Sequence, residues 1–176
     1  MLRPAAFLDR DGVINIDKGY VYKISDFEWT EGAVEAIRSL NEKNYYVFIV
    51  TNQSGISRGI FDENDVEKLH DYVNKKLSKK SAKIDEFFYS PYHPSDGSKK
   101  YIHLKNLRKP NTGMLEIADA KWNIDKSKSF LIGDKETDIQ CARNFGIKGY
   151  LFKEKNLFNF LFGKGISLIL CNSILF

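Results

Sequence analysis

The chain has 176 residues, of which 43% are hydrophobic, and it carries a formal net charge of +4 at pH 7. This length and apolar content allow one sizeable core, and no Ser/Gly/Pro-rich linker divides the sequence, so we expect a single domain over residues 1–176. The mild positive charge suits an anionic ligand but excludes the strongly basic composition typical of nucleic-acid-binding proteins.

Short apolar runs of strand type alternate with segments of helical period, as in β-α-β units around a parallel sheet. The predicted strands are Ala5–Leu8, Tyr45–Val50, Ile84–Tyr89, Ser129–Ile132 and Gly149–Phe152. The predicted helices are Gly32–Lys43, Asp62–Lys79, Gly113–Trp122 and Lys135–Phe145. Asp62 stands where a helix N-cap is favoured. The order of these elements predicts an α/β fold with a parallel central sheet.

Two segments do not fit this alternation. Ser90–Arg108 contains two prolines and a glycine without a clear period, which predicts a long loop, and loops of this length are often functional. Residues 157–176 are unusually apolar for a terminus, but the run after Lys164 is far shorter than the roughly 20 residues of a membrane-spanning helix. We expect a short helix and then a strand that completes the core or a dimer seam, rather than a peripheral membrane contact.

The cysteine usage and the amino terminus bear on the cellular setting. Cys141 and Cys171 have no partner at a redox or metal-binding spacing, which indicates a reduced, cytoplasmic environment. The first apolar run, at residues 5–8, is too short for a signal peptide. We therefore expect a cytoplasmic protein without a cleaved leader.

Reactive side chains follow three of the predicted strands, at the edge where open parallel sheets bind ligands. The segments are Asp9-Arg10-Asp11-Gly12, Thr51-Asn52-Gln53-Ser54-Gly55 and Gly133-Asp134-Lys135 with Asp138 beyond it, and Arg108-Lys109-Pro110 precedes a predicted helix. Each segment alone would suit an ordinary turn or helix cap. Together they place carboxylates, a hydroxyl and a lysine around one point, a set that can hold Mg²⁺ and a phosphoryl group.

The residue types also suggest chemical roles. Asp9 and Asp134 suit Mg²⁺, and the Asp9 carboxylate can attack phosphorus to form an aspartyl-phosphate. A turn at Gly12 would bring Asp11 to the site as general acid and then general base. Thr51 can donate its hydroxyl to a phosphoryl oxygen, and Lys109 can neutralise the charge of the transferring group.

Asp9-x-Asp11, Thr51, Lys109 and Gly133-Asp134 with Asp138 resemble the four motifs of the haloacid dehalogenase superfamily, over roughly residues 5–152. The resemblance implies a Rossmannoid three-layer α/β/α sandwich. The spacings from Gly12 to Tyr45 and from Gly55 to Arg108 leave no room for a separate cap domain.

Within this superfamily, residues 7–12, 15–21, 50–59 and 108–110 resemble the D-glycero-D-manno-heptose 1,7-bisphosphate phosphatases. That resemblance implies removal of the 7-phosphate during synthesis of nucleotide-activated heptose for lipopolysaccharide or related glycans. It implies Mg²⁺ bound by the carboxylates of Asp9 and Asp134 and the backbone carbonyl of Asp11. The residues that it places against substrate are Asp17, Lys18, Gly19, Tyr20, Asn52, Gln53, Arg108, Lys109 and Lys135. Arg108 suits the second phosphate because a guanidinium can bond two oxygens together.

The long loop departs from the pattern of these relatives, which usually bind zinc there with a Cys-x-His segment and a later Cys-x-Cys. The matching positions here are Ser90, Tyr92, Lys105 and Leu107. His93 and His103 alone fall short of a four-ligand structural site. We predict that no zinc binds and that Tyr92, Tyr101, Leu104 and Leu107 order the loop by packing.

Several alternatives remain beside the sugar phosphatase. A histidinol-phosphate phosphatase would share most of the motifs, although residues 18–20 and 53–55 favour the sugar. A polynucleotide 3′-phosphatase is disfavoured because there is no aromatic and basic stripe. A phospho-accepting receiver domain would place its acceptor aspartate where this chain has Thr51, and a catalytically inactive binding protein would not need every reactive residue. We expect a small phosphorylated sugar as partner, no nucleic acid, no stable membrane insertion, and a monomer or homodimer.

Overall fold

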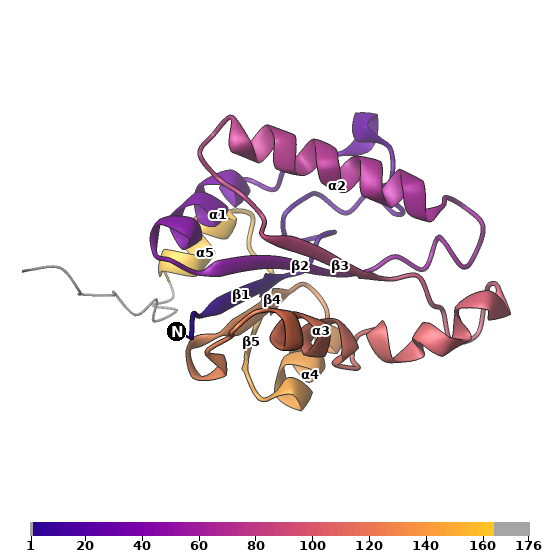
Figure 1. The fold of residues 1–176 in the computed structure, drawn as a ribbon. Coiled ribbons are helices and arrows are strands. Elements are labelled where there is room, and N and C mark those ends of the chain that lie inside the picture. Colours follow the sequence, from indigo (N-terminus) through magenta and orange to yellow (C-terminus); the bar gives the residue numbers. More distant parts are fainter. Residues whose placement is uncertain (1, 164–176) are drawn as a thin grey trace, which may run out of the picture.

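Five short parallel strands form the centre of the fold in the computed structural model, which describes residues 2–163 (Figure 1). The strands are β1 (Ala5–Leu8), β2 (Tyr46–Asn52), β3 (Glu86–Ser90), β4 (Phe130–Gly133) and β5 (Lys148–Leu151). Their order across the sheet is β3-β2-β1-β4-β5, and every pair is parallel. β1 therefore lies at the centre, with β2 and β4 as its neighbours.

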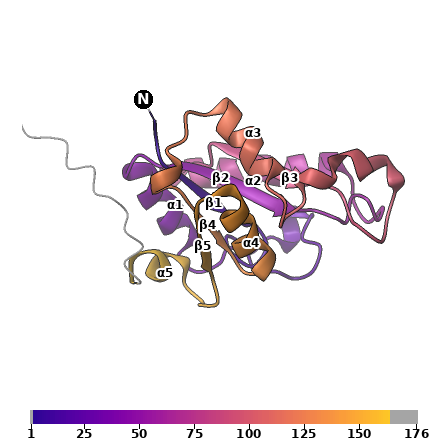
Figure 2. The same ribbon diagram turned by 90° about the horizontal axis from the view of Figure 1, so that it is seen from below.

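Helices cover both faces of the sheet, which gives the predicted three layers (Figures 1 and 2). One layer consists of α1 (Ala33–Glu42), α2 (Glu63–Ser78) and α5 (Leu157–Gly163), and the other of α3 (Gly113–Lys121) and α4 (Glu136–Phe145). Along β1, Ala6 and Leu8 pack toward the first layer, whereas Ala5 and Phe7 pack toward the second. Because both faces are buried at the centre of the sheet, β1 and β4 appear in the sequence as continuous apolar runs.

The helices and strands predicted between residues 5 and 152 are all present, and their ends differ from the predictions by no more than two residues. The second strand runs further than expected, because Thr51 and Asn52 continue the ladder beside Tyr89 and Ser90 of β3. Because the side chains of these two residues are polar, the apolar pattern in the sequence did not predict this extension. The predicted cap of α2 is confirmed, since the Asp62 side chain accepts a hydrogen bond from the Asp65 backbone N–H at 2.9 Å.

The segment predicted as a loop at 90–108 contains a 3-10 helix, Lys99–Leu107, so that prediction is wrong for these nine residues. A 3-10 helix repeats every three residues, so it leaves no 3.6-residue period in the sequence. Tyr101 is buried in a small cluster that Tyr92 and Leu104 also contact, as predicted, whereas Leu107 packs against the α3 layer instead.

The other connections also contain little regular secondary structure. Residues 9–32 contain turns, isolated bridges and the 3-10 helix Ile24–Asp26, and a further 3-10 helix, Lys126–Lys128, precedes β4. Over residues 2–163, neither the segment from Gly12 to Tyr45 nor that from Gly55 to Arg108 forms a separate cap domain at the carboxyl edge of the sheet. Among the helices that the structure describes, none is both long and apolar enough to span a membrane.

The apolar tail begins as predicted with a short helix, α5, which packs beside α1. Leu157, Phe160 and Leu161 are buried in the core of that layer, and the Phe160 ring meets the edge of Phe152 at a centroid distance of 5.2 Å. This part of the tail therefore completes the core. The strand predicted to follow lies outside the described residues.

We expect Phe160→Ala to lower the free energy of unfolding by about 3–5 kcal/mol, because it removes a buried ring and leaves a cavity. Phe158→Ala is the matched control on the same helix, since Phe158 is 36% exposed and Phe160 only 2%. The control should change stability by less than about 1 kcal/mol. Urea unfolding of both variants makes the comparison, and equally small losses would show that α5 is not part of the core.

Candidate active site

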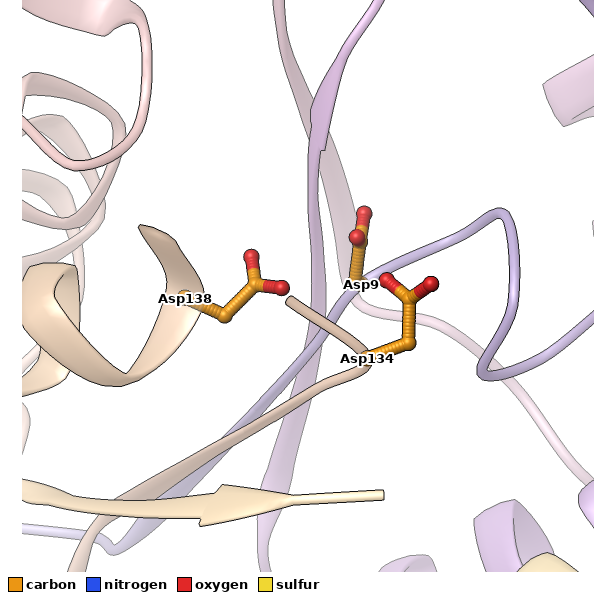
Figure 3. A group of neighbouring side chains, drawn as sticks. All are labelled: Asp9, Asp134 and Asp138. Carbon is orange, nitrogen blue, oxygen red and sulfur yellow. The ribbon is translucent and has the colours of Figure 1, made fainter. Parts of the chain in front are cut away.

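Three aspartates converge where the two central strands end (Figure 3). Asp9 follows β1, Asp134 follows the neighbouring β4, and Asp138 lies in the first turn of α4. One carboxylate oxygen from each lies within 4.8 Å of the other two. The crossovers on the two sides of β1 and β4 run in opposite directions, so the cluster occupies the switch point where open α/β sheets bind ligands.

The predicted turn at Gly12 is present, and it requires glycine. Gly12 has φ of +87° and donates its N–H to the carbonyl of Asn15 at 2.8 Å. A Cβ at this position would lie 2.6 Å from Oδ2 of Asp134. Glycine therefore permits both the left-handed backbone and the close approach of the turn to Asp134.

Lys109 is buried between two of the aspartates. Its Nζ lies 3.0 Å from Oδ1 of Asp9 and 2.5 Å from Oδ1 of Asp138. Burial favours the neutral amine, but the two carboxylates outweigh it, so the pKa of Lys109 ends above its ordinary value. The ammonium therefore stays charged and links Asp9 to α4. Asp138 also accepts the backbone N–H of Lys135 at 3.0 Å, which caps that helix.

The two aspartates at the strand ends resist ionisation in the metal-free protein. Burial raises the pKa of Asp9 to about 7, and the charge of Lys109 only partly opposes this. Burial also raises the pKa of Asp134, whose Oδ1 is buried without a hydrogen-bond partner among residues 2–163. An unpaired buried oxygen beside two further carboxylates fits a hard divalent cation, and carboxylate oxygens are the ligands that Mg²⁺ prefers.

The polar end of β2 supports the site from the other side. Thr51 Oγ1 accepts a hydrogen bond from Gln53 at 2.9 Å, which leaves its own O–H available as a donor. Asn52, which was predicted to contact substrate, also bonds the backbone N–H and carbonyl of Lys109 through its side-chain amide, at 3.0 and 3.2 Å. Asn52 thus holds the segment that carries Lys109.

A cavity of about 440 Å³ opens beside these groups. The predicted site residues that line it are Asp9, Asp11, Asp17, Gly19, Tyr20, Thr51, Asn52, Gln53, Arg108, Lys109 and Lys135. Two predicted site residues, Asp134 and Lys18, do not line the cavity. Asp134 faces the aspartate cluster, and the Nζ of Lys18 forms an ion pair with Glu28 at 2.8 Å. Most of the site residues predicted from the sequence therefore line this cavity.

The cavity also contains residues that the sequence prediction left out of the site, namely Ser54, Pro110, Thr137 and Asp138. Asp138 belongs to the motif that begins at Gly133-Asp134, but its pairing with Lys109 depends on how α4 packs. Its place in the first turn of a helix that follows Gly133-Asp134 was the available signal.

We expect Asp138→Ala to lower the free energy of unfolding by about 3 kcal/mol, because Lys109 loses one of its two buried counter-charges and α4 loses a cap. Asp138→Asn is the matched control, since its shape is kept and its single amide oxygen can still accept from either Lys109 or the Lys135 N–H, and it should cost clearly less. Urea unfolding without divalent metal measures both. Equal losses, or losses below about 1 kcal/mol in both, would contradict a structural role for this pairing.

Comparison with known proteins connects this site to named phosphatases. A family model described as HAD-hydrolase-like matches residues 106–155. The chain is 42% identical over 155 residues to a D-glycero-beta-D-manno-heptose-1,7-bisphosphate 7-phosphatase from Rhodopseudomonas palustris, covering 88% of this chain and 86% of the relative. It is 40% identical over 147 residues to the enzyme of the same name from Escherichia coli K12, covering 82% and 77%.

A solved structure shows the same fold. The D,D-heptose 1,7-bisphosphate phosphatase from B. bronchiseptica, complexed with magnesium and phosphate, has a TM-score of 0.76 to this chain and 28% sequence identity. The similarity covers 92% of this chain and 87% of that structure. The likeness therefore extends over most of both chains.

Proposed function

The chain belongs to the HAD-like hydrolases, in the family of the D-glycero-beta-D-manno-heptose-1,7-bisphosphate 7-phosphatases, and we propose that it removes the 7-phosphate of this sugar bisphosphate with the help of Mg²⁺. It is a phosphatase, as its relatives are. One observation carries the choice of substrate: the cavity that holds Asp9 and Lys109 also presents a second strong cation, Arg108. A sugar with two phosphates needs two such cationic sites.

In the proposed reaction Asp9 is the nucleophile. Its Oδ1 accepts hydrogen bonds from the Arg10 backbone N–H at 2.7 Å and from Lys109, so the attack falls to Oδ2. The bond from Asp9 to phosphorus forms as the bond from phosphorus to the sugar oxygen breaks, and Asp11 gives that oxygen a proton. Water then attacks phosphorus, Asp11 takes the proton, and Asp9 is released. Thr51 and Lys109 bind the phosphoryl oxygens.

The metal would be held by the carboxylates of Asp9 and Asp134 and the backbone carbonyl of Asp11. Asp138 is engaged by Lys109 and by the start of α4, whereas Asp134 has a buried oxygen without a hydrogen-bond partner in the part of the chain that the structure describes. Mg²⁺ would neutralise the charge of the transferring phosphoryl group. The zinc-free long loop remains a prediction, and both ring nitrogens of His93 face other partners, Arg58 and the Asp96 backbone N–H.

The proposal places the chain before a nucleotide-transfer reaction, because the product retains its 1-phosphate for activation toward lipopolysaccharide or a related glycan. The names of the relatives support the β anomer. A cytoplasmic location, a small sugar as the only substrate class, and a monomeric or homodimeric state remain predictions.

Phosphate release in the presence of Mg²⁺ tests the substrate. We expect kcat/KM for the β anomer of heptose 1,7-bisphosphate to exceed the values for the α anomer, histidinol phosphate and common sugar monophosphates by at least about a hundredfold, or about 2.7 kcal/mol. Asp9→Asn should abolish release on every substrate while the protein still unfolds cooperatively. Even activity across the panel would overturn the heptose assignment, and substantial turnover by Asp9→Asn would overturn the nucleophile.

Mg²⁺ binding should strengthen as the pH rises, because the metal needs an ionised Asp9 and burial raises the pKa of this carboxyl to about 7. A raised acid pKa stabilises the metal-free fold at low pH, and this contribution is lost as the pH rises through about 7. From one pH unit below this pKa to one above, we expect Mg²⁺ affinity to increase about tenfold, measured by calorimetric titration. Asp134→Asn is the control and should bind weakly at every pH. A pH-independent affinity in the wild type would contradict the prediction.

A further inference from the structure

Arg10 is a fully buried cation in the middle of the catalytic segment. Its side chain is 0% exposed, and arginine is almost never fully buried unless it is paired. Three acceptors surround the guanidinium: the Asp11 carboxylate, the Val21 carbonyl and the His70 imidazole. The function proposed above uses the backbone N–H of Arg10 but gives its side chain no role.

The guanidinium holds the Asp11 carboxylate by both oxygens. Nη2 of Arg10 lies 2.9 Å from Oδ2 and 3.2 Å from Oδ1 of Asp11, and Nε lies 3.4 Å from Oδ1. The amides of Asn15 and Gln53 add donors at 3.0 and 2.9 Å, one to each oxygen. The Asp11 side chain keeps 18% of its surface exposed and lines the cavity, so these donors fix the orientation from behind and leave the substrate side open.

The other face of Arg10 is anchored in the core. His70 of α2 is buried, stacks on Phe87 at 4.3 Å, and places Nε2 3.4 Å from Nη1 of Arg10. Burial, helped by the charge of Arg10, lowers the pKa of His70 to about 3, so the imidazole is neutral and can accept from the guanidinium. The Val21 carbonyl, at the end of the loop 17–21, accepts from the same Nη2 that bonds Asp11.

We propose that Arg10, anchored by His70 and Val21, is a positioning residue that orients Asp11 for proton transfer to the leaving oxygen and from the attacking water. This inference rests on the proposed function, because it deepens the role given there to Asp11. A lysine could supply the same charge, but not the planar guanidinium that reaches both carboxylate oxygens and two further acceptors together. The geometry therefore assigns Arg10 a role that its charge alone does not fulfil.

Arg10→Lys compared on two esters tests the proposal. p-Nitrophenolate leaves without a proton, whereas the alkoxide of a sugar phosphate needs one. We expect kcat/KM of the variant to fall about a hundredfold on heptose 1,7-bisphosphate, or on the best sugar monophosphate if the heptose is not a substrate, as expected when general-acid catalysis is lost. On p-nitrophenyl phosphate kcat/KM should fall less than about threefold.

The two-step chemistry gives a second readout. Asp11 also activates the water that attacks the aspartyl-phosphate, so on p-nitrophenyl phosphate kcat and KM of Arg10→Lys should fall together. A burst of p-nitrophenolate equal to the enzyme concentration should precede the slow phase. A merely structural role would lower the active fraction, reducing kcat on both esters equally, with unchanged KM and no burst, and that result would overturn the proposal.

Two further variants serve as a second test and as a control. His70→Leu removes the buried acceptor without touching Asp11, and it should shift the ester ratio in the same direction by about three- to tenfold, so an unchanged ratio would count against the anchor. Arg3→Lys is the matched control, because the Arg3 guanidinium also bonds two carbonyls, those of Asn44 and Tyr45 at 2.7 Å, but lies before the start of β1. A ratio that shifts as much in Arg3→Lys would overturn the assignment to Arg10.

Discussion

The burial of Lys109 between Asp9 and Asp138 is the interaction on which the rest of the site depends. Three carboxylates and one ammonium meet at the strand ends, so full ionisation leaves two negative charges in a buried cluster. Unbalanced buried charge is costly, and the raised pKa of Asp9 is the expression of that cost in the metal-free protein. A divalent cation at Asp134 would balance the charge, which would couple the proposed metal to the ionisation of the proposed nucleophile.

The fold delivers these groups because the sheet order places β1 and β4 side by side. Both strands are buried on both faces, so their ends cannot shift without disturbing two cores. Contacts from the loops then fix the finer geometry: Gly12 allows the turn against Asp134, and Asn52 bonds the backbone of Lys109 on both sides. The precision that phosphoryl transfer needs thus comes from rigid strand ends and from backbone hydrogen bonds.

How well the sequence predicts a feature depends on whether local sequence patterns or contacts between distant elements determine it. The strands, the helices and the edge that carries Asp9 and Asp134 follow from local apolar patterns and from the rule for open sheets. Pairings across elements do not follow from local patterns, so the sequence did not predict the contacts of Asp138 with Lys109, of Arg10 with His70 or of Asn52 with the Lys109 backbone. The 3-10 helix at 99–107 was not predicted, because its period of three residues differs from the 3.6-residue period of an α-helix.

The catalytic centre and the loops that border the substrate are held together by different forces. Asp9, Lys109 and Asp138 are buried, whereas the loops meet at the partly exposed guanidinium of Arg58, which contacts the Tyr20 hydroxyl, His93 Nε2 at 3.0 Å and Asp96 at 3.1 Å. Exposed polar contacts contribute little stability each, so these loops can open at a smaller free-energy cost than the strand ends. The proposed reaction chemistry therefore depends on the core, while under the proposed function the choice of substrate would depend on loops that sequence change can alter without disturbing Asp9.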